Sequence, residues 1–243
     1  MTDVNMVEKE GIARIGAVHQ PRMVREGPMV VGRVTLDGQT VTLRPMTMDD
    51  VEQLFEAGKA PDIWRHTATA PVLQVEDMTD YVREALGEEE RGESLPFVIV
   101  RRADNAITGA TRFSNISRAD RRLSIGWSWL NPTAHGTGIN GEAKALMLRQ
   151  AFDAWGAIRV EIRADVRNSR SRAAIEGIGG TCEGILRQQL IVRGRVRDTA
   201  LYSIVDLDWR DPLHRAHRNA LRHGINPAAT SPLDADPVTI KPR

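Results

Sequence analysis

One stretch constrains the fold of this chain more than any other, residues 123–155, with the sequence LSIGWSWLNPTAHGTGINGEAKALMLRQAFDAW. Its first part, Leu123–Leu130, is apolar or aromatic at nearly every second position, which predicts a strand. The loop Asn131–Gly141 holds three glycines, and a helix is expected from about Asn140 to Trp155. A strand that ends in such a loop before a helix directs backbone N–H groups and the positive helix end at one place. The stretch therefore predicts a site for a phosphate or diphosphate group.

The rest of the chain alternates between strands and helices. Short alternating apolar runs bounded by turn residues predict strands, and apolar residues spaced three and four apart predict helices. Further strands are expected at residues 30–36, 39–45, 96–102, 107–116, 158–166, 182–192 and 196–208, and further helices at 47–58, 75–90 and 168–178. Three strands with short turns precede the loop, so an antiparallel meander is expected there. The fold class is thus α+β, with one body at about residues 29–210.

Irregular arms are expected at both ends of this body. Residues 1–28 are polar and interrupted by Gly and Pro, and residues 211–243 predict a short basic helix followed by an extended tail. Such arms are compatible with a homodimer.

The composition bears on which partners the protein can bind and on the cellular compartment that suits it. A net charge of +1 supplies no bulk attraction to nucleic acid or an anionic membrane. No apolar run approaches the roughly 18 residues of a membrane span. The single cysteine, Cys182, excludes a disulfide framework within the chain and fits a reducing cytoplasm.

The segment Gly136–Gly141 matches the pattern G-x-G-x-x-G, so a dinucleotide-binding fold is an alternative. Glu161 even stands about 20 residues onward, where a ribose contact is expected. Three features argue against this interpretation. Residues 131–135 separate the loop from its strand, antiparallel strands precede it, and the chain ends in a hairpin instead of further βα units. A Walker-type phosphate loop is excluded because no Gly-Lys-Ser/Thr sequence follows the glycines.

The order of elements, together with three motifs, resembles the GNAT superfamily of N-acetyltransferases. HGTGINGEAKALMLRQAF resembles the acyl-CoA motif Gln/Arg-x-x-Gly-x-Gly/Ala, placed at residues 135–140. RVEIRADVRNSRSRAAIEGIGGTCEGILR resembles the next motif, with Asn168 and Ser171 at the strand–helix junction, and RDTALYSI resembles the last strand. The closest branch is that of the Rim-type ribosomal-protein N-terminal acetyltransferases. The resemblance covers roughly residues 39–209 and implies a mixed, mostly antiparallel sheet flanked by helices.

This resemblance implies transfer of an acetyl group from acetyl-CoA, the cosubstrate, to a primary amine by direct attack within a ternary complex. The preferred candidate for the acceptor is a protein N-terminal amine, and the second candidate is a small amine. The residues implied in acetyl-CoA binding are Trp129, Leu130, His135, Gly136, Thr137, Gly138, Ile139, Asn140 and Asn168. His135 stands where the family has Gln or Arg, and Asn140 stands where it has Gly or Ala.

The catalytic groups are less regular than the cofactor site. Many family members carry a tyrosine as general acid on the second motif's helix, but the equivalent residue here is Ile175, which leaves Ser171 as the nearby hydroxyl. Glu161, Asp165 and Asp198 are candidates for a base that acts through water, and Asp198 is preferred because it begins the last strand. An α-amine with a pKa of about 7.7–8.0 needs little activation. The missing tyrosine keeps open a second hypothesis, a non-catalytic acyl-CoA-binding or scaffold protein.

Other residues have a functional and a structural interpretation. Trp64 and His66 either shape the acceptor pocket or lie on a solvated loop. Cys182 is expected to be a buried or half-buried strand residue rather than a nucleophile. Arg118, Arg121 and Arg122 are expected in a solvated turn, with the CoA 3′-phosphate as the alternative. No His, Cys or Asp residues have the spacing of a metal site.

Overall fold

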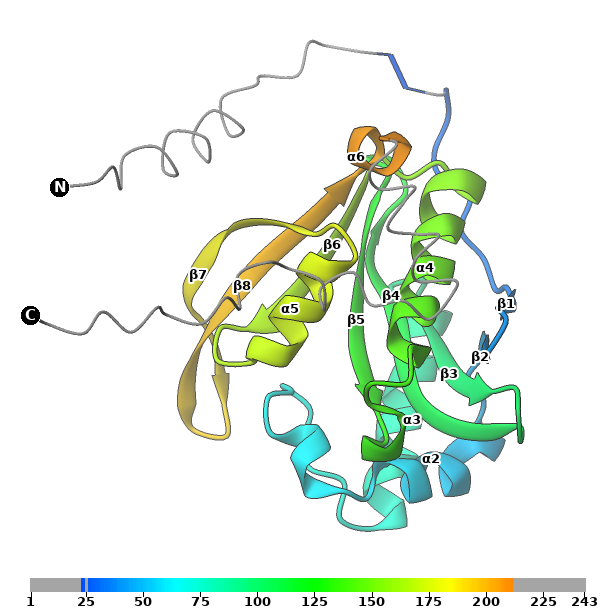
Figure 1. The fold of residues 1–243 in the computed structure, drawn as a ribbon, viewed down its shortest axis with the longest axis vertical. Coiled ribbons are helices and arrows are strands. Elements are labelled where there is room, and N and C mark those ends of the chain that lie inside the picture. The colour runs from blue at the N-terminus through cyan, green and yellow to red at the C-terminus, as the bar shows by residue number, and fades with distance from the viewer. Residues whose placement is uncertain (1–22, 25, 212–243) are drawn as a thin grey trace, which may run out of the picture.

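Residues 23–24 and 26–211 are described by the structure, a computed structural model, and they contain an eight-stranded sheet with helices on both faces (Figure 1). The strand order is β1-β2-β3-β4-β5-β6-β8-β7. Every neighbouring pair is antiparallel except β5 and β6, which are parallel. The predicted α+β class and the meander before the loop are confirmed. The expectations for residues 1–22 and 212–243 lie outside the described residues.

Most element boundaries agree with the sequence periodicity within one or two residues. The strands are β1 (Leu36–Asp37), β2 (Val41–Pro45), β3 (Leu95–Arg101), β4 (Ala106–Ser117), β5 (Arg122–Leu130), β6 (Arg159–Asp165), β7 (Thr181–Val192) and β8 (Arg195–Val205). The helices are α2 (Val51–Gly58), α3 (Val75–Glu90), α4 (Ile139–Arg149), α5 (Ser169–Gly177) and α6 (Asp206–Arg210). A π-helical turn, Gln150–Ala154, continues α4 almost to the predicted end.

Two strand predictions were too long. Residues 30–35 do not pair in the sheet, because other contacts hold this segment away from it. Met29 N–H donates to the Arg118 carbonyl at 2.9 Å, and Arg33 forms an ion pair with Glu89 at 2.7 Å. The last strand ends at Val205 instead of Asp208. The Asp208 carboxylate accepts a hydrogen bond from Val205 N–H and begins α6 there.

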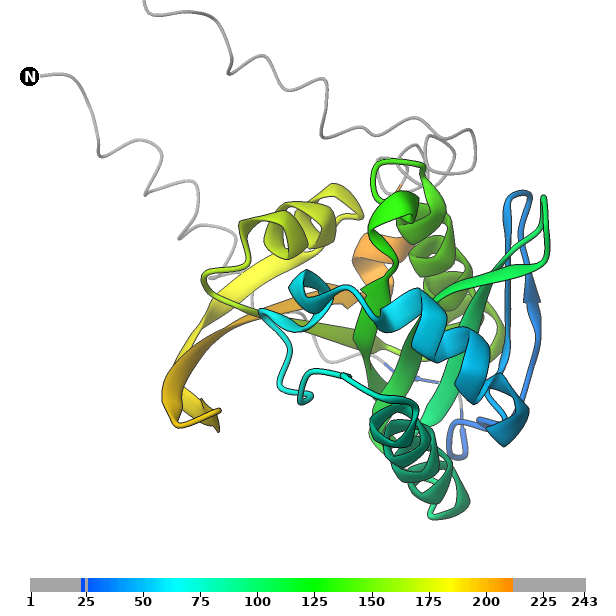
Figure 2. The ribbon, with the colours of Figure 1, turned by 90° about the horizontal axis from the view of Figure 1, so that it is seen from below.

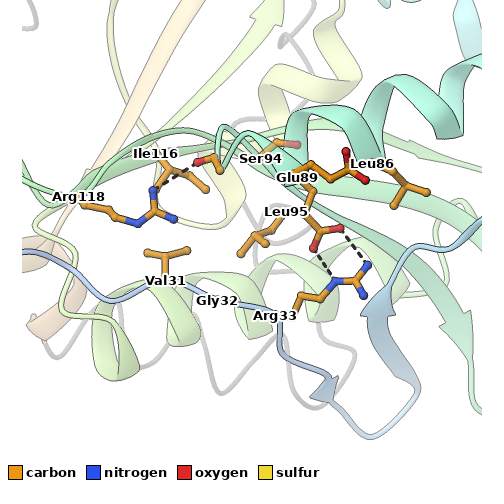
Figure 3. A pocket seen from close by; sticks show the side chains of 11 residues that line it. Val31, Gly32, Arg33, Leu86, Glu89, Ser94, Leu95, Ile116 and Arg118 are labelled. Carbon is orange, nitrogen blue, oxygen red and sulfur yellow. Dashed lines mark hydrogen bonds and ion pairs between the residues drawn. The ribbon is translucent and has the colours of Figure 1, made fainter.

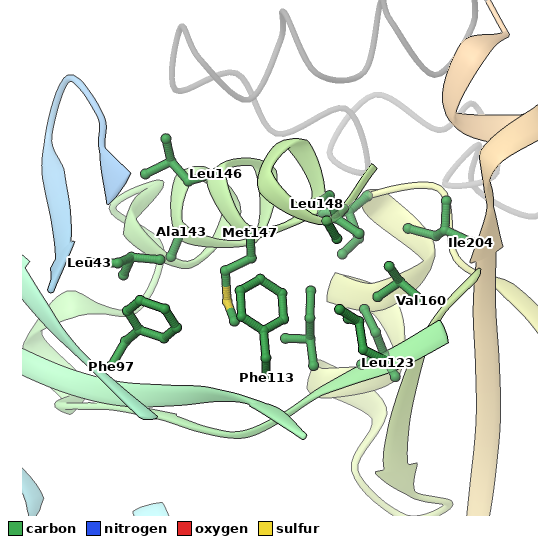
Figure 4. Packing of buried hydrophobic residues seen from close by; sticks show 14 of the residues in the cluster. Leu43, Phe97, Phe113, Leu123, Ala143, Leu146, Met147, Leu148, Val160 and Ile204 are labelled. Carbon is green, nitrogen blue, oxygen red and sulfur yellow. The ribbon is translucent and has the colours of Figure 1, made fainter. Parts of the chain in front are cut away.

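Each face of the sheet has its own core. Helices α4 and α5 cover one face, and α2 and α3 cover the other (Figure 2). Under α4, Phe97, Phe113 and Leu123 pack against Met147 and Leu148 (Figure 4). On the opposite face, Trp64, Tyr81 and Trp129 pack as a cluster of aromatic rings with centroids 5.3–6.5 Å apart. The two layers fix the position of β5, which contributes side chains to both cores.

A buried carboxylate anchors the start of α4. Glu142 accepts hydrogen bonds from Gln39 N–H and from both Thr40 N–H and the Thr40 hydroxyl, in the β1–β2 turn. Gly38 leaves room for it, because a Cβ atom there would collide with the Glu142 carboxylate. Among the described residues, no helix is both long and apolar enough to cross a membrane.

Candidate functional site

The glycine-bearing loop adopts the backbone that its sequence predicts. Gly136 and Gly138 have φ angles of 75° and 85°, and Gly138 is the N-cap residue of α4. L-residues with a side chain rarely adopt such angles. A Cβ atom at Gly136 would meet no atom within 4 Å, so the loop faces open space. The first turn of α4 therefore presents its unpaired N–H groups and its positive end beside an accessible loop.

The pairing of β5 with β6 ends before β5 reaches this loop, and we call the unpaired stretch between the two strands the opening. The parallel pairing of β5 with β6 covers only the pairs from Arg122–Arg159 to Ile125–Ile162. Beyond Ile125 the two strands diverge (Figure 1). Residues 126–130 keep β4 as their partner and have none in β6 among the described pairs. An edge of this kind can take a ligand that carries amide groups, because backbone N–H and C=O groups need partners.

A β-bulge lies at the point where the strands separate. The β4–β5 register shifts between Ala110 and Arg112, and Trp127 has a φ angle of 48°. The bulge gives β5 an extra residue opposite Thr111, so the local backbone bends. Trp127 is 43% exposed and faces the α3 side, where the Arg112 guanidinium lies 5.2 Å from its ring. The bulge thus directs the Trp127 side chain to the α3 face at the point where β5 separates from β6.

The first turn of α5 borders the loop. The Asn168 carboxamide oxygen accepts a hydrogen bond from Ser171 N–H at 3.1 Å, so Asn168 is the N-cap residue of α5. The Ser171 side chain is half-buried. Arg170, which sequence reasoning did not single out, lies 3.1 Å from Nδ1 of His135. Burial, and then the charge of Arg170, hold the pKa of His135 below its usual range, so its imidazole is neutral at pH 7.

The α3 face of the sheet contains a buried cation that sequence reasoning also missed. Arg112 is 1% exposed, forms an ion pair with Glu88 at 3.0 Å and lies 4.9 Å from the Tyr81 ring centroid. The Tyr81 hydroxyl accepts a hydrogen bond from the Trp129 indole N–H. The alternating pattern of β4 could not signal this residue, because a lone arginine in a strand is commonly exposed.

Lys144 is the other buried cation that the sequence did not reveal. It lies on α4 with 6% exposure, and its Nζ contacts the hydroxyls of Thr111, at 3.0 Å, and Ser128. Burial lowers the pKa of this amine to about 7. Its position three residues after Gly141 in a helix gave no signal, since lysine is a common surface residue in helices.

Most predicted site residues border the loop or the opening. Asp198 lies on β8, on the other side of the opening. The side chains of Trp129 and Leu130 are buried, whereas their backbone belongs to the open half of β5. The Asp198 carboxylate accepts a hydrogen bond from Gln188 N–H at 2.7 Å, and its carbonyl accepts one from Val166 N–H just beyond β6. Ile175 is 5% exposed and packs in the core, so no hydroxyl stands there.

Three structural expectations need correction. Arg121 is buried rather than solvated, because it donates to the carbonyls of Gly27 and Gly156. Arg118 and Arg121 precede β5 and Arg122 is its first residue, whereas the glycine loop follows this strand, so a strand of about 25 Å separates all three from the predicted phosphate site. Cys182 is exposed, because β7 is an edge strand. Trp64 is a core residue whose indole N–H donates to the Gly58 carbonyl.

Two hollows differ in their relation to the loop. One of about 450 Å³ adjoins it, between Thr137 and Ile139 on one side and Arg101 and Arg102 on the other. A second of about 500 Å³ lies between residues 31–33 and the end of α3, with the Arg33–Glu89 ion pair at its side (Figure 3). Its wall includes Arg118, so it lies at the far end of the sheet from the loop. Among the described residues, no group of three His, Cys, Asp or Glu side chains could hold a metal ion.

Comparison with known proteins agrees with this geometry. Residues 40–181 match the family described as acetyltransferase (GNAT) domain. YdaF of Bacillus subtilis is 33% identical over 106 residues, which cover 44% of this chain and 57% of YdaF.

Solved structures are similar over most of both chains. A GCN5-related N-acetyltransferase from Brucella melitensis has a TM-score of 0.74 and 27% identity, covering 80% of this chain and 88% of that one. Mycobacterium smegmatis RimJ, solved in complex with CoA-disulfide, has a TM-score of 0.66 and 26% identity, covering 81% of this chain and 94% of that one. The mixed sheet and its flanking helices are therefore the fold of this group.

Proposed function

Because the chain belongs to the acetyltransferase (GNAT) family and uses acetyl-CoA as its acetyl donor, we propose that its acceptor is a primary amine. The preferred acceptor is a protein N-terminal amine. The observation that carries the proposal is the continuous path from the glycine loop along the open half of β5 to the bulge. The similarity to YdaF, a putative ribosomal N-acetyltransferase, supports a protein N-terminus ahead of a small amine.

The residues fit acetyl-CoA at each part of its length. Residues 135–140 offer backbone N–H groups to the diphosphate, and the open space over Gly136 admits it. The amides of the pantetheine arm would pair with the backbone of Trp129 and Leu130, and Asn168 borders the arm from α5. The arm then brings the thioester to the bulge, where a backbone N–H can stabilise the developing oxyanion.

The acceptor amine would approach from the α3 face. Trp127, Arg112 and Glu88 lie on that face of the bulge. The amine nitrogen attacks the thioester carbon, and the C–S bond breaks in the same ternary complex. Asp198, acting through water, is the proposed base. The departing thiolate takes its proton from a hydroxyl beside the opening, for which Ser171 on α5 and Ser128 on β5 are the two candidates. We also propose a homodimer, for which the terminal segments were expected to provide contacts, and light scattering after size exclusion would test it.

Three measurements test the acceptor and the two catalytic residues. CoA should bind in isothermal titration, and acetyl-CoA with a panel of N-terminal peptides and small amines should release free thiol. Asp198→Asn should lower kcat by about 100-fold or more while leaving acetyl-CoA affinity unchanged, and Ser171→Ala should do the same if Ser171 is the donor to the thiolate. CoA binding without turnover of any acceptor would favour a non-catalytic acyl-CoA-binding or scaffold role, which the missing hydroxyl at Ile175 makes the second candidate. Turnover of small amines alone would contradict the protein acceptor.

A further inference from the structure

Lys144 is a buried amine without an acidic partner. The Nζ atom lies among the hydroxyls of Thr111 on β4 and Ser128 on β5, and Met147 of its own helix also contacts Thr111. Within the described part of the chain, no carboxylate lies within ion-pair distance of it. A buried charge without a counterion is costly, so a structural role alone gives little reason for a lysine here.

Ser128 places this amine beside the opening. It belongs to the bulged segment of β5, beyond the last β5–β6 pair, and the residue is exposed although Lys144 is not. Its hydroxyl therefore stands between Nζ and the space where the strands separate. It also lies 3.3 Å from the Gly126 carbonyl and 2.8 Å from the Thr111 hydroxyl, so it has alternative partners when it turns toward the opening.

The acetyl transfer needs a proton at this place. The departing sulfur leaves with an electron pair, and Ile175 supplies no hydroxyl to protonate it. A serine hydroxyl does not titrate near neutral pH by itself, so it can act as a donor only when another group replaces its proton. In the described residues, Ser128 is hydrogen-bonded to a titratable group and the Ser171 hydroxyl is not.

We propose that Ser128, rather than Ser171, protonates the departing CoA thiolate and that Lys144 is the positioning residue that resupplies the Ser128 proton. In this step the C–N bond forms, the C–S bond breaks, and its electron pair moves to sulfur. The Ser128 proton passes to sulfur and a Lys144 ammonium proton passes to the Ser128 oxygen. Lys144 is left neutral, and the proton lost by the attacking amine returns to it through solvent. The inference rests on the proposed acetyl transfer and assigns its general acid.

Burial supports this role, because it lowers the pKa of Lys144 to about 7. A proton donor works best when its pKa lies near the working pH. An exposed lysine, with a pKa of about 10.4, would hold its proton too tightly. Thr111 and Ser128 carry no charge, and Met147 is apolar, so no neighbouring group raises the pKa again.

A titration followed by NMR tests the contact with sulfur without any acceptor. The chain has four lysines, Lys9, Lys59, Lys144 and Lys241, so lysine labelled with ¹⁵N gives few side-chain signals. Lys144→Met assigns the signal of Lys144. We expect the CoA complex to show a Lys144 pKa about one unit higher than the desulfo-CoA complex, because a thiolate favours the ammonium. Equal pKa values in the two complexes would overturn the proposal.

Kinetics provide a second test with the acceptor that the panel identifies. Lys144→Met and Ser128→Ala should each lower kcat by about 100-fold, with acetyl-CoA affinity unchanged. Both should also lose the alkaline decline of kcat that deprotonation of Lys144 causes. Lys59→Met, which removes an exposed lysine of an ion pair with Glu56, is the matched control and should keep wild-type kcat.

The outcomes separate this proposal from the proposed function. If the wild type binds CoA and releases thiol but the two variants keep its kcat and pH profile, the proton relay is wrong and the acetyl transfer stands. If the wild type releases no thiol with any acceptor, the proposed acceptor fails, and the NMR comparison still decides whether Lys144 senses the sulfur.

Discussion

At the scale of single residues, the site depends on groups whose environment differs from what their type leads one to expect. Gly136 and Gly138 occupy backbone conformations that disfavour other residues. His135 is kept neutral by burial and by Arg170. Lys144 and Arg112 are buried cations on opposite faces of the same bulge. These features support the proposed diphosphate site at one end of the opening and place buried polar groups at the other.

Replacing Gly136 with Ala should separate backbone strain from ligand binding. The added methyl group would meet no protein atom, so the cost to stability is that of the positive φ angle, about 1–2 kcal/mol. The same group would enter the space over the loop and should weaken CoA binding at least tenfold, or by about 1.4 kcal/mol. Thermal unfolding and isothermal titration measure the two effects.

Gly194 offers a matched control for this substitution. It has a φ angle of 72° and equally open surroundings, but it lies in the β7–β8 turn. Gly194→Ala should lose similar stability and keep its CoA affinity. Equal weakening of CoA binding in both variants would contradict the assigned cradle.

Lys144 should also make the free energy of unfolding depend on pH. Its pKa is about 7 when folded and about 10.4 when unfolded, so between these values the unfolded state binds more protons. The free energy of unfolding should therefore rise with pH across this range, on the order of 4 kcal/mol in total.

Lys144→Met removes this dependence, so its stability advantage over the wild type should be largest below pH 7 and shrink toward pH 10. Urea unfolding at several pH values measures it. A constant difference between the two proteins would show that the amine is not neutralised by folding.

At the scale of elements, the glycine loop joins β5 to α4. Two segments from the other half of the sheet, the start of α5 and the β7–β8 hairpin, lie near the proposed site. Asn168 caps α5 beside the loop. The β7–β8 hairpin reaches the loop after α2, where Nη2 of Arg193 donates to the carbonyls of Trp64, Thr67 and Thr69 at 2.7–3.0 Å. The hairpin thus holds the segment that follows α2, which lies on the side from which the acceptor is proposed to approach.

Arg193→Ala should therefore affect the acceptor rather than acetyl-CoA. Loss of three charge-assisted hydrogen bonds would free the loop at residues 64–69, and the acceptor KM should rise about tenfold while the CoA dissociation constant stays constant. Arg195→Ala, in the same hairpin and exposed, is the control. Steady-state kinetics with varied acceptor would detect the change, and an unchanged KM would remove the hairpin from acceptor binding.

At the scale of the whole molecule, the sheet consists of two arms joined by the short parallel pairing of β5 and β6. The first arm contains β1–β5 and the core under α2 and α3, and the second contains β6–β8. The core under α4 and α5 includes residues of both arms. Because the arms diverge beyond Ile125, acetyl-CoA in the opening would contact both. Binding should therefore order the molecule across the join.

Hydrogen exchange should report this ordering. On addition of CoA, amides of residues 126–130 and 135–140 should exchange at least about tenfold more slowly, since an added ligand stabilises the closed backbone by mass action. Residues 95–101 of β3, paired on both sides, serve as the internal reference. Protection confined to the hollow in Figure 3 would place the ligand at the wrong end of the sheet.

Local patterns predicted the elements that carry strong periodicity. Helix α3 and strand β5 were predicted within one residue, because apolar spacing and turn residues define them without help from distant segments. Residues 30–35 were predicted as a strand and are not one. Their alternation is genuine, but Met29 and Arg33 bind Arg118 and Glu89, far away in sequence, and take the segment away from the sheet.

The sequence by itself determined the strand, glycine loop and helix at residues 123–155, and the proposed place of the diphosphate rests on these elements. Glycine angles, helix caps and apolar periods are local properties, so nearby residues suffice to specify them. The tertiary structure alone decided that Thr111, Ser128 and Lys144 meet behind the bulge, and that Arg112 lies between Tyr81 and Trp127. Burial and charge depend on residues from separate elements, so the chemistry of these cations is fixed only when the sheet and its helices pack together.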